Sequence, residues 1–358
     1  MTKRFGLILL AVSLLASCRN NNGDTLMPRG KVSTEWAAAA EAFIAETDSV
    51  QAPDIAKTNS IMIVHHGKVV FEQYYDGFTP DSTLDVYSVS KTLLALAVGC
   101  AADEGLLSVD DRVIDYFPDK LPENVSDTLS ALKISHLLTM TCGLEETPKL
   151  LAAFSGKDDF DWLEEFFNSR QAHMPGTSFY YNFFSPYIVS AILEKVTGLG
   201  VVDYITPRLL EPLHITDLVW KDSPAGICVG GWGLSVCTED MAKIGQLIIQ
   251  HGKWNGRQLV PAEWVGTMTS NLVASKPLSA FTYRMDPKML EDPENDHSQG
   301  YGYYVWQGKS GTYRAEGLKG RHIIISPSKE TVFAITSNSN MDQRYFDLIW
   351  KHFGNLIY

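Results

Sequence analysis

Ser88 and Lys91 are the residues whose types and spacing point most directly to chemistry. They stand three positions apart in Tyr87-Ser-Val-Ser-Lys91, so in a helix both side chains lie on one face, one turn apart. A serine hydroxyl beside a lysine amine is a nucleophile beside a base that can take its proton. The spacing therefore predicts acyl transfer; the alternative is an N-cap serine followed by a surface lysine.

The residues that follow indicate how this pair is positioned. The run 92–105 is apolar around nearly its whole circumference until Asp103, which predicts a helix buried inside the domain. Ser88 would then lie at the N-terminus of that helix, where unpaired N–H groups and the helix dipole favour a developing oxyanion. Burial disfavours an ammonium ion, so we expect a lowered pKa for Lys91.

The same tetrad occurs twice more, which makes the spacing alone a weak signal. Ser130 and Lys133 lie in a polar connection without a long apolar helix behind them, and Ser326 and Lys329 flank Pro327 in a turn composition. We expect neither pair to converge as Ser88 and Lys91 do.

The N-terminal residues 1–18 read as a secretion signal. A basic start precedes a short apolar run that is too short to span a bilayer comfortably, and it ends in Leu15-Ala-Ser-Cys18. This ending resembles the lipobox of bacterial lipoproteins, so Cys18 is the expected lipidation site; the alternative is an ordinary signal with an incidental cysteine. Residues 19–30 read as a polar tether. The expected location is the cell envelope, anchored to the membrane and facing the periplasm or the cell surface.

Composition narrows the class of protein further. The formal net charge of −12 with no basic cluster argues against nucleic acid as a partner. No metal-binding motif is present, so neither a metal nor another cofactor is expected. Cys228 and Cys237 are candidates for a disulfide in an oxidising compartment, although their spacing does not establish one.

The order of expected elements predicts an α/β (α+β) fold. A helix over 37–44 and a hairpin over 60–75 begin the chain, and strand-like runs at 301–306, 312–316, 321–325 and 331–336 precede an amphipathic helix over 341–357. The middle is mostly helical. We expect one antiparallel sheet made from the N- and C-terminal segments, flanked by helices, with an inserted helical lobe and a cleft between them.

Two helices of the middle region have clear end signals. Ser185-Pro186 resembles an N-cap followed by proline, with Gly198 in the C′ position after the apolar run. Thr238 is the expected cap of a helix over 241–249.

Several blocks in a fixed order resemble the serine β-lactamase and penicillin-binding-protein superfamily. They are Ser88-Val-Ser-Lys-Thr92 with the run that follows it, Ile134-Ser-His-Leu-Leu-Thr-Met-Thr-Cys-Gly-Leu144, Pro175-Gly-Thr-Ser-Phe179 and Gly230-Gly-Trp-Gly-Leu234. The similar branch is the class C β-lactamase-related group, with its esterases and 6-aminohexanoate-oligomer hydrolases. The resemblance implies a β-lactamase/transpeptidase-like domain over 31–358, with an α/β lobe of 31–90 and 295–358 and a helical lobe of 91–294.

The second motif of this family, Y-x-N, is altered here. Family register places the tyrosine, which acts with the lysine in proton transfer, at Tyr181, and the asparagine position then falls on Phe183. A shift by one residue would restore the motif with Tyr180 and Asn182, and Asn182 is a candidate substrate contact. Either tyrosine could instead be an aromatic core residue.

The third motif, K-T-G or H-x-G on an inner strand, corresponds to Ala315-Glu-Gly317. The cationic position is therefore alanine. Gly317 still lets the strand approach a substrate, and the resemblance implies that Leu318 N–H completes an oxyanion hole with Ser88 N–H. In a regular strand Arg314 points to the face opposite Ala315 and replaces the missing cation poorly.

These features predict a serine hydrolase of small ester, amide or peptide-like substrates that acts through an acyl-enzyme. A β-lactamase or D,D-peptidase is one alternative, and a non-catalytic protein that binds cell-wall fragments is another. The aromatic residues Trp162, Phe166 and Phe167 are expected to pack the helical lobe rather than to line a pocket.

Overall fold

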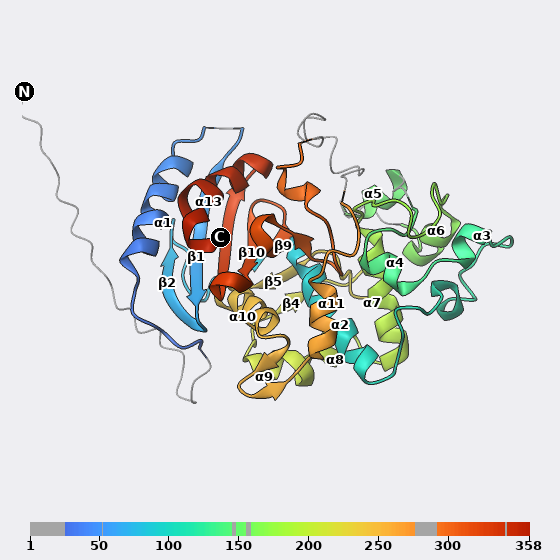
Figure 1. Cartoon of the computed structure of the whole chain (residues 1–358). Helices are drawn as coiled ribbons and strands as arrows, with labels where there is room; N and C mark the ends of the chain where they lie inside the picture. The colour runs from blue at the N-terminus through green and yellow to red at the C-terminus, as the bar shows by residue number, and fades with distance from the viewer. Residues whose placement is uncertain (1–25, 52, 145–147, 155–158, 276–291, 341) are drawn as a thin grey trace, which may run out of the picture.

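A six-stranded antiparallel sheet lies at the centre of the fold in the computed structural model (Figure 1). The structure describes residues 26–358 except 52, 145–147, 155–158, 276–291 and 341. The order of the sheet is β2-β1-β11-β10-β9-β8. The strands are β1 (Ala56–His65), β2 (Lys68–Tyr74), β8 (Trp306–Gln307), β9 (Tyr313–Gly317), β10 (Arg321–Ser326) and β11 (Thr331–Ser339). The N-terminal hairpin thus pairs with the C-terminal meander through β1 and β11, which confirms the expected sheet.

The strand expected over 301–306 is much shorter than predicted. Only Trp306 and Gln307 form β8, and Tyr301 makes isolated bridges to Val273 and to Trp306. The backbone at Tyr304 has a φ of +56°, a left-handed conformation that ends regular strand pairing. The aromatic composition of this segment serves packing rather than a long strand.

Most of the regular structure outside this sheet is helical. Its α-helices are α1 (Thr34–Thr47), α2 (Ser90–Asp103), α3 (Asp127–Ser130), α4 (Ile134–Leu138), α5 (Pro148–Phe154), α6 (Trp162–Asn168), α7 (Phe184–Thr197), α8 (Val201–Ile205), α9 (Glu211–Leu213), α10 (Thr238–Ile249), α11 (Ala262–Met268) and α13 (Asp342–Ile357). Short strands β3 (Leu84–Asp85), β4 (Val219–Trp220) and β5 (Leu234–Val236) form a second sheet, and β6 (Lys253–Trp254) pairs with β7 (Arg257–Gln258). The helical insertion between the two halves of the main sheet confirms the expected architecture.

Both faces of the sheet are covered, so its central strands are apolar on both sides. Along β1, Ile61 and Ile63 face a core shared with α1 and α13, whereas Met62 and Val64 face the larger core on the other side. This alternation follows from the two-residue period of a strand. Figure 1 shows α1 and α13 together on one face, away from α10 and α2.

Helix α2 is the buried helix that the sequence predicted. Every residue from Ser90 to Ala101 is buried, so the helix has no solvent face over three turns. Its surroundings come from α7, α8, α11 and β9. A helix enclosed on all sides holds the residues at its N-terminus in one position, which is where Ser88 and Lys91 lie.

The starts of two other helices differ from the expected caps. α7 begins at Phe184, one residue before Ser185, and the side chain of Asn182 accepts the Ser185 N–H at 2.7 Å; Gly198 does close the helix, with a φ of +69°. In α10, Thr238 is the first helical residue rather than the cap, because its hydroxyl bonds to Ser60 Oγ at 2.6 Å. The tertiary contact with Ser60 overrides the local capping preference of Thr238, whereas in α7 the neighbouring Asn182 takes the capping role expected of Ser185.

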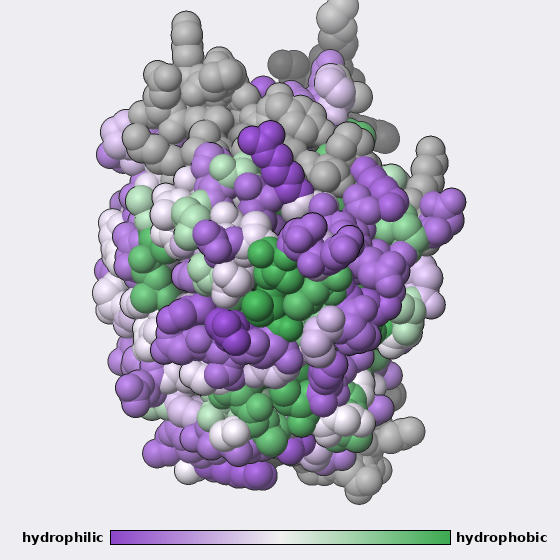
Figure 2. Space-filling view, turned by 90° about the vertical axis from the view of Figure 1, so that its right-hand side faces the viewer, coloured by the Kyte–Doolittle hydropathy of each residue, from purple (hydrophilic) through white to green (hydrophobic). Residues whose placement is uncertain are grey.

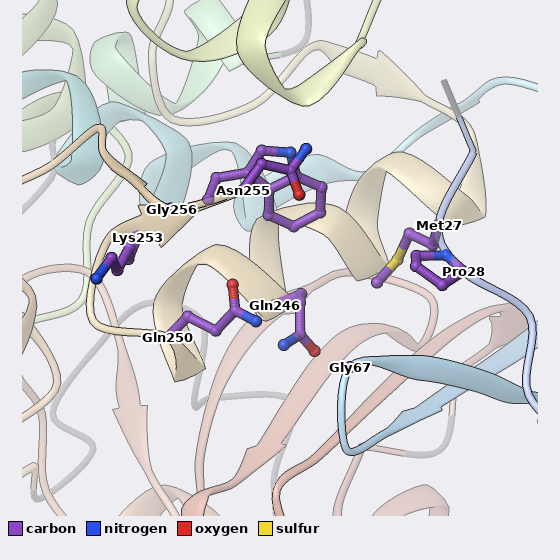
Figure 3. Close-up of a pocket in the computed structure, with 9 residues that line it drawn as sticks. Met27, Pro28, Gly67, Gln246, Gln250, Lys253, Asn255 and Gly256 are labelled. Carbon is purple, nitrogen blue, oxygen red and sulfur yellow. The ribbon is translucent and has the colours of Figure 1, made fainter. Parts of the chain in front are cut away.

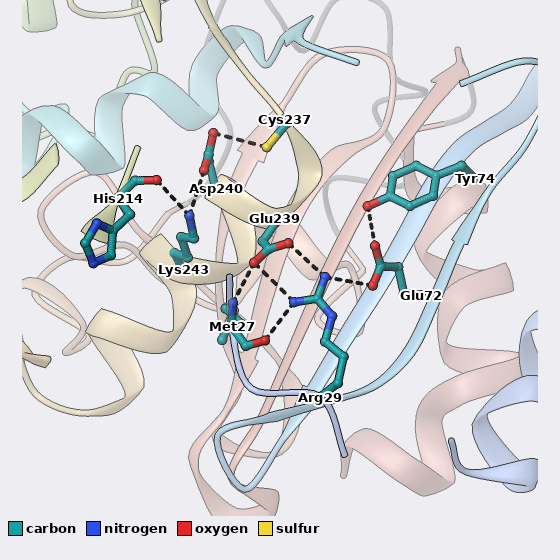
Figure 4. Close-up of polar contacts among 9 residues, drawn as sticks. All are labelled: Met27, Arg29, Glu72, Tyr74, His214, Cys237, Glu239, Asp240 and Lys243. Carbon is teal, nitrogen blue, oxygen red and sulfur yellow. Dashed lines mark hydrogen bonds and ion pairs between the residues drawn. The ribbon is translucent and has the colours of Figure 1, made fainter. Parts of the chain in front are cut away.

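Residues 27–29, in the first described segment, form hydrogen bonds and ion pairs with the sheet and with α10 (Figure 4). Met27 N–H donates to Glu239 Oε1 at 2.6 Å, and Arg29 donates to both carboxylate oxygens of Glu239 and to Glu72. Glu239 is 3 % exposed in the first turn of α10, where the helix dipole also favours its charge. Charge-assisted bonds of this kind hold residues 27–29 beside the edge strand β2.

The two cysteines considered for a disulfide are both buried free thiols. Burial raises the pKa of Cys237 to about 12, and the thiol lies 3.1 Å from Asp240 Oδ2. The pairing of Cys228 with Cys237 is therefore not present, and Cys237 contributes to the packing at the start of α10. Cys18 lies outside the described residues.

The surface of the helical end of the molecule is mixed. Figure 2 shows apolar side chains in separate areas set among hydrophilic ones on this side. Among the described residues, no helix is both long enough and apolar enough to cross a bilayer. The same part of the chain contains no group of three or more His, Cys, Asp or Glu residues that could hold a metal ion.

His322 makes the stability of this fold sensitive to pH. Its ring is 4 % exposed on β10 and packs against Phe346 of α13, and burial lowers its pKa to about 3. In the unfolded chain this histidine has a pKa of about 6.5 and is protonated below that pH, whereas in the folded chain it stays neutral down to a much lower pH. The free energy of unfolding therefore falls as the pH drops below about 6.5. We expect a loss of about 2 kcal/mol between pH 7 and pH 5 from this residue.

Thermal melts at pH 7 and pH 5 test this expectation with His322→Phe. The variant should lose less stability than the wild type over that interval. The control is Ile324→Val, a buried substitution on the same strand that removes no titratable group, so its loss of stability between pH 7 and pH 5 should equal that of the wild type. Equal losses in the wild type and His322→Phe would contradict the assignment.

Candidate active site

The turn that carries Ser88 is held in a strained conformation. Residues Tyr87–Val89 form a single 3-10 turn before α2, and Tyr87 has a φ of +50°, which is unfavourable for a bulky side chain. Tyr87 N–H donates to Asp85 Oδ1 at 2.8 Å, and Val86 N–H donates to Leu234 O at 2.8 Å. The small β3-β5 sheet therefore fixes the backbone immediately before the serine.

Ser88 and Lys91 meet as the sequence predicted. Lys91 Nζ lies 2.8 Å from Ser88 Oγ and 2.8 Å from the carbonyl oxygen of Gly231. Ser88 is 9 % exposed and Lys91 is 1 % exposed, so the lysine sits beneath the serine rather than at the surface. The Ser88 hydroxyl is thus the member of the pair that a substrate can reach.

The other two tetrads do not form such pairs. Lys133 Nζ bonds to Asp110 at 2.8 Å, while Ser130 Oγ donates to Asp127 O. Ser326 Oγ donates to the carbonyl of Ile357 at the end of α13. Only the pair at the start of the buried helix brings its serine and lysine together.

Tyr181 is the tyrosine that lies beside the lysine. The centroid of its ring is 5.0 Å from Lys91 Nζ, and the ring stacks on Trp306 at 5.4 Å. Tyr180 is held through its backbone, since its N–H donates to Met140 O and its carbonyl accepts the Asn182 amide. Of the two tyrosines that the sequence left open, Tyr181 thus has its ring against Lys91.

The two residues after Tyr181 have different positions. The centroid of the Phe183 ring lies 5.6 Å from Lys91 Nζ, so this nitrogen is near two aromatic rings. Asn182 is fully buried, and its amide bonds to Tyr180 O and Cys142 Sγ while its oxygen accepts Ser185 N–H. With these partners Asn182 caps α7, and its side chain is not presented to a substrate as the sequence suggested.

Strand β9 lies directly against the nucleophile turn at Gly317. A Cβ added to Gly317 would lie 2.1 Å from Val86 O and 3.2 Å from Ser88 N, so only glycine allows this approach. Leu318, the next residue, is half-buried at the end of the strand. The backbone at the end of β9 thus lies in contact with the backbone of the turn that carries Ser88.

Arg314 does not replace the cation missing at Ala315. Its guanidinium donates to Glu316 Oε2 at 2.7 Å and packs on the ring of Phe346 in α13, on the face away from the nucleophile. His297 Nε2 lies 2.7 Å from Glu316 Oε1. Burial alone would raise the pKa of Glu316, but the charges of His297 and Arg314 hold it well below its usual range.

Two contacts of the site were not expected from the sequence. The carbonyl of Gly231 is an acceptor for Lys91, and Trp306 supports the ring of Tyr181. Gly231 and Trp306 are each more than a hundred positions from their partners. The sequence signalled only Gly231, through the family-like Gly230-Gly-Trp-Gly block. Trp162, Phe166 and Phe167 are buried in the helical lobe, as expected, and Trp162 stacks on Trp232 at 5.9 Å.

Comparisons with known proteins agree with this geometry. The Beta-lactamase family model matches residues 47–351. A 6-aminohexanoate-dimer hydrolase from Paenarthrobacter ureafaciens is 23 % identical over 345 residues, which cover 90 % of this chain and 85 % of the relative. The family model and this relative therefore each match most of the chain.

Solved structures show the same fold. A Bacillus anthracis protein with a provisional 6-aminohexanoate-dimer hydrolase name superposes with a TM-score of 0.73 at 17 % identity, over 94 % of this chain and 89 % of that one. A family VIII carboxylesterase superposes with a TM-score of 0.64 at 15 % identity, over 90 % and 99 % of the two chains. With its buried Ser-x-x-Lys helix and a family match over most of its length, this chain belongs to the β-lactamase family of serine hydrolases.

Proposed function

We propose that this protein hydrolyses esters or short amides through an acyl-enzyme on Ser88. The observation that carries the proposal is the 2.8 Å separation of Lys91 Nζ and Ser88 Oγ beneath a strand that approaches Ser88 N. A proton can pass along that contact without any movement of the backbone. The names of the two relatives, an amide hydrolase and a carboxylesterase, support the same class of reaction.

In the first step Ser88 Oγ forms a bond to the substrate carbonyl carbon while its proton passes to Lys91, with Tyr181 as a second proton carrier. The oxyanion is stabilised by the N–H groups of Ser88 and Leu318. The bond to the leaving alcohol or amine then breaks, and the leaving group takes the proton. Water repeats the sequence on the acyl-enzyme and releases the acid and free Ser88.

The residue at position 315 supports uncharged esters and amides over β-lactams or D-alanyl peptides. A carboxylate on the substrate would ordinarily be held by a cation there, and Ala315 offers none. Arg314 is engaged with Glu316 on the other face, while Lys319 in the following turn and Arg321 at the start of β10 lie over the ring of Tyr87. The non-catalytic alternative is less well supported because the serine, the lysine and the tyrosine are all retained together.

A direct assay compares wild-type protein and Ser88→Ala, both starting after Cys18, on p-nitrophenyl butyrate and on a chromogenic cephalosporin. We expect faster turnover of the ester, a transient butyryl adduct in the intact mass of the wild type, and neither in Ser88→Ala. Faster cephalosporin turnover would instead favour a β-lactamase. Absence of turnover and of an adduct with both compounds would contradict an enzymatic role.

We also propose that the protein is anchored to the membrane of the cell envelope through lipidated Cys18. The apolar run and the Leu15-Ala-Ser-Cys18 ending support this anchor. Because Met27 and Arg29 are bonded to α10 and β2, the tether would consist of the few residues between Cys18 and Met27. Full-length protein expressed in a Gram-negative host should incorporate radioactive palmitate and sediment with membranes. Cys18→Ser should lose the label, and labelling that persists in this variant would contradict the site.

A further inference from the structure

Arg321, the first residue of β10, is a buried cation beside the candidate active site. It is 6 % exposed, and its Nε has no hydrogen-bond partner among the described residues. Burial lowers the pKa of its guanidinium, and no carboxylate in the described part of the chain forms an ion pair with it. A buried charge without a counter-ion is unfavourable for folding, so stability alone does not account for this arginine.

The guanidinium of Arg321 contacts two turns that are far apart in the sequence. Its central carbon lies 5.5 Å from the centroid of the Tyr87 ring, within the range of a cation–π contact. Its Nη1 donates to Lys319 O at 2.8 Å, in the turn between β9 and β10. The backbone of Arg321 pairs with Gly317, the residue that approaches Ser88 N. One side chain therefore joins the turn before α2 to the turn that follows β9.

Each of these turns contains a strained residue that Arg321 contacts. Tyr87 has a φ of +50° and Lys319 a φ of +61°, left-handed conformations that are unfavourable for residues with a bulky side chain. Such conformations persist only where the surrounding structure holds them. Ser337 Oγ of β11 also donates to Lys319 O, at 2.9 Å, so the second turn is held from two strands. The contacts of Arg321 thus fall on two positions where the backbone needs support.

The two strained residues are the direct neighbours of the two donors in the proposed oxyanion hole. Tyr87 immediately precedes Ser88, and Lys319 immediately follows Leu318. A shift of either turn would therefore change the separation of the two N–H groups. Arg321 is the residue whose side chain contacts both turns at these neighbours.

We infer that Arg321 is a positioning residue that fixes the two sides of the oxyanion hole relative to each other. This role rests on the proposed acyl-enzyme mechanism, in which the N–H groups of Ser88 and Leu318 stabilise the negative charge on the former carbonyl oxygen. Arg321 acts through Tyr87 and Lys319, so its loss changes the geometry of the hole rather than the identity of the donors. Donors held in place act mainly in the transition state, so kcat should depend on Arg321 and KM should not.

Steady-state kinetics on p-nitrophenyl butyrate test this role in protein that starts after Cys18. Arg321→Met keeps an unbranched stem and removes the guanidinium, so it should lower kcat by about tenfold to a hundredfold while KM stays within about twofold. Arg321→Lys keeps a cation near the Tyr87 ring and should have a kcat between those of Arg321→Met and the wild type. Butylboronic acid, which forms a tetrahedral adduct with a serine hydroxyl, should bind Arg321→Met more weakly by the factor that kcat/KM loses.

Two control variants separate this role from a general loss of packing or of charge. Arg208→Met removes a guanidinium that also lies over a tyrosine ring, 4.0 Å from the centroid of Tyr204, and also donates to a backbone carbonyl, Tyr204 O, at 2.9 Å. Lys253→Met removes an exposed charge at the pocket of about 560 Å³ beside α10 (Figure 3). Both variants should keep the kcat of the wild type.

A double-mutant cycle tests whether Arg321 acts through Tyr87. Tyr87→Leu should also lower kcat, and the double variant should lose less than the product of the two single losses. Wild-type kcat in Arg321→Met, or losses that multiply, would overturn the inference and leave the hydrolase proposal intact, whereas a wild type without turnover would overturn both. If Arg321→Met does not fold, Arg321→Lys decides: reduced kcat at unchanged KM supports the role, and wild-type kcat overturns it.

Discussion

Lys91→Met should lower kcat/KM for p-nitrophenyl butyrate by about 10³-fold or more, while the protein remains folded. The lysine Nζ is 2.8 Å from Ser88 Oγ and is 1 % exposed, so no solvent base can take its place beside the hydroxyl. Methionine fills nearly the same volume and removes both the proton acceptor and the bond to Gly231 O. The intact-mass assay should show no acyl adduct on the time scale of wild-type turnover.

The matched control is Lys243→Met, because Lys243 is a second lysine with 1 % exposure. It bonds to His214 O at 2.9 Å and pairs with Asp240 at the start of α10 (Figure 4). Its loss leaves Asp240 buried without this partner and should lower stability by about 3 kcal/mol, yet activity per folded molecule should stay within a few-fold of the wild type. Wild-type turnover by Lys91→Met would refute the role of Lys91 as the base.

Gly317→Ala should lower kcat/KM by about 10²-fold to 10³-fold through the oxyanion hole. The new methyl group would lie 2.1 Å from Val86 O and 3.2 Å from Ser88 N. Both are backbone atoms, so neither can move aside as a flexible side chain would. Strand β9 must therefore shift away from the nucleophile turn, and the N–H of Leu318 shifts with it. A change in kcat with little change in KM is expected, since the lost interaction is strongest in the transition state.

Gly266→Ala is the control for this substitution. Gly266 lies in α11, and an added Cβ there meets nothing within 4 Å, so the variant should be as active as the wild type and at least as stable. Acylation rates measured by rapid quench and intact mass should fall in Gly317→Ala alone. An unchanged acylation rate in Gly317→Ala would contradict a role for the strand in stabilising the oxyanion.

The buried ion pair on the far face of β9 explains how the strand can be held so close. Arg314 and Glu316 alternate with Ala315 along the strand, and the pair is closed by His297. Arg314 Nη1 also donates to Asp296 O and Gln307 O, so the strand is bonded to neighbouring segments, while Arg314 Nη2 has no partner among the described residues. Ala315, which stands where the family has a cation, thus points to one face of β9, and Arg314 and Glu316 point to the other.

Local sequence signals were sufficient for the elements that position the site. The unbroken apolar run after Lys91 predicted a buried helix, and the strand patterns at both ends of the chain predicted one antiparallel sheet, because hydrophobic periodicity records which faces are buried. The three-residue spacing likewise determines that Ser88 and Lys91 share a helix face. Three copies of that spacing exist, however, and the enclosed α2 helix distinguishes the first of them.

Contacts between distant segments lay beyond these signals. Family register alone places the motif tyrosine at Tyr181, whereas the contacts of its ring with Lys91 and with Trp306, 125 positions away, come from the tertiary structure. The sequence predicts Asn182 as a substrate contact, whereas in the structure its NH₂ group lies 3.6 Å from Cys142 Sγ, 40 positions away, and its oxygen accepts the Ser185 N–H. Side-chain partners of this kind are selected by packing across the whole chain, so a periodic pattern specifies the helix and the strand, and the tertiary structure specifies which residue faces the substrate.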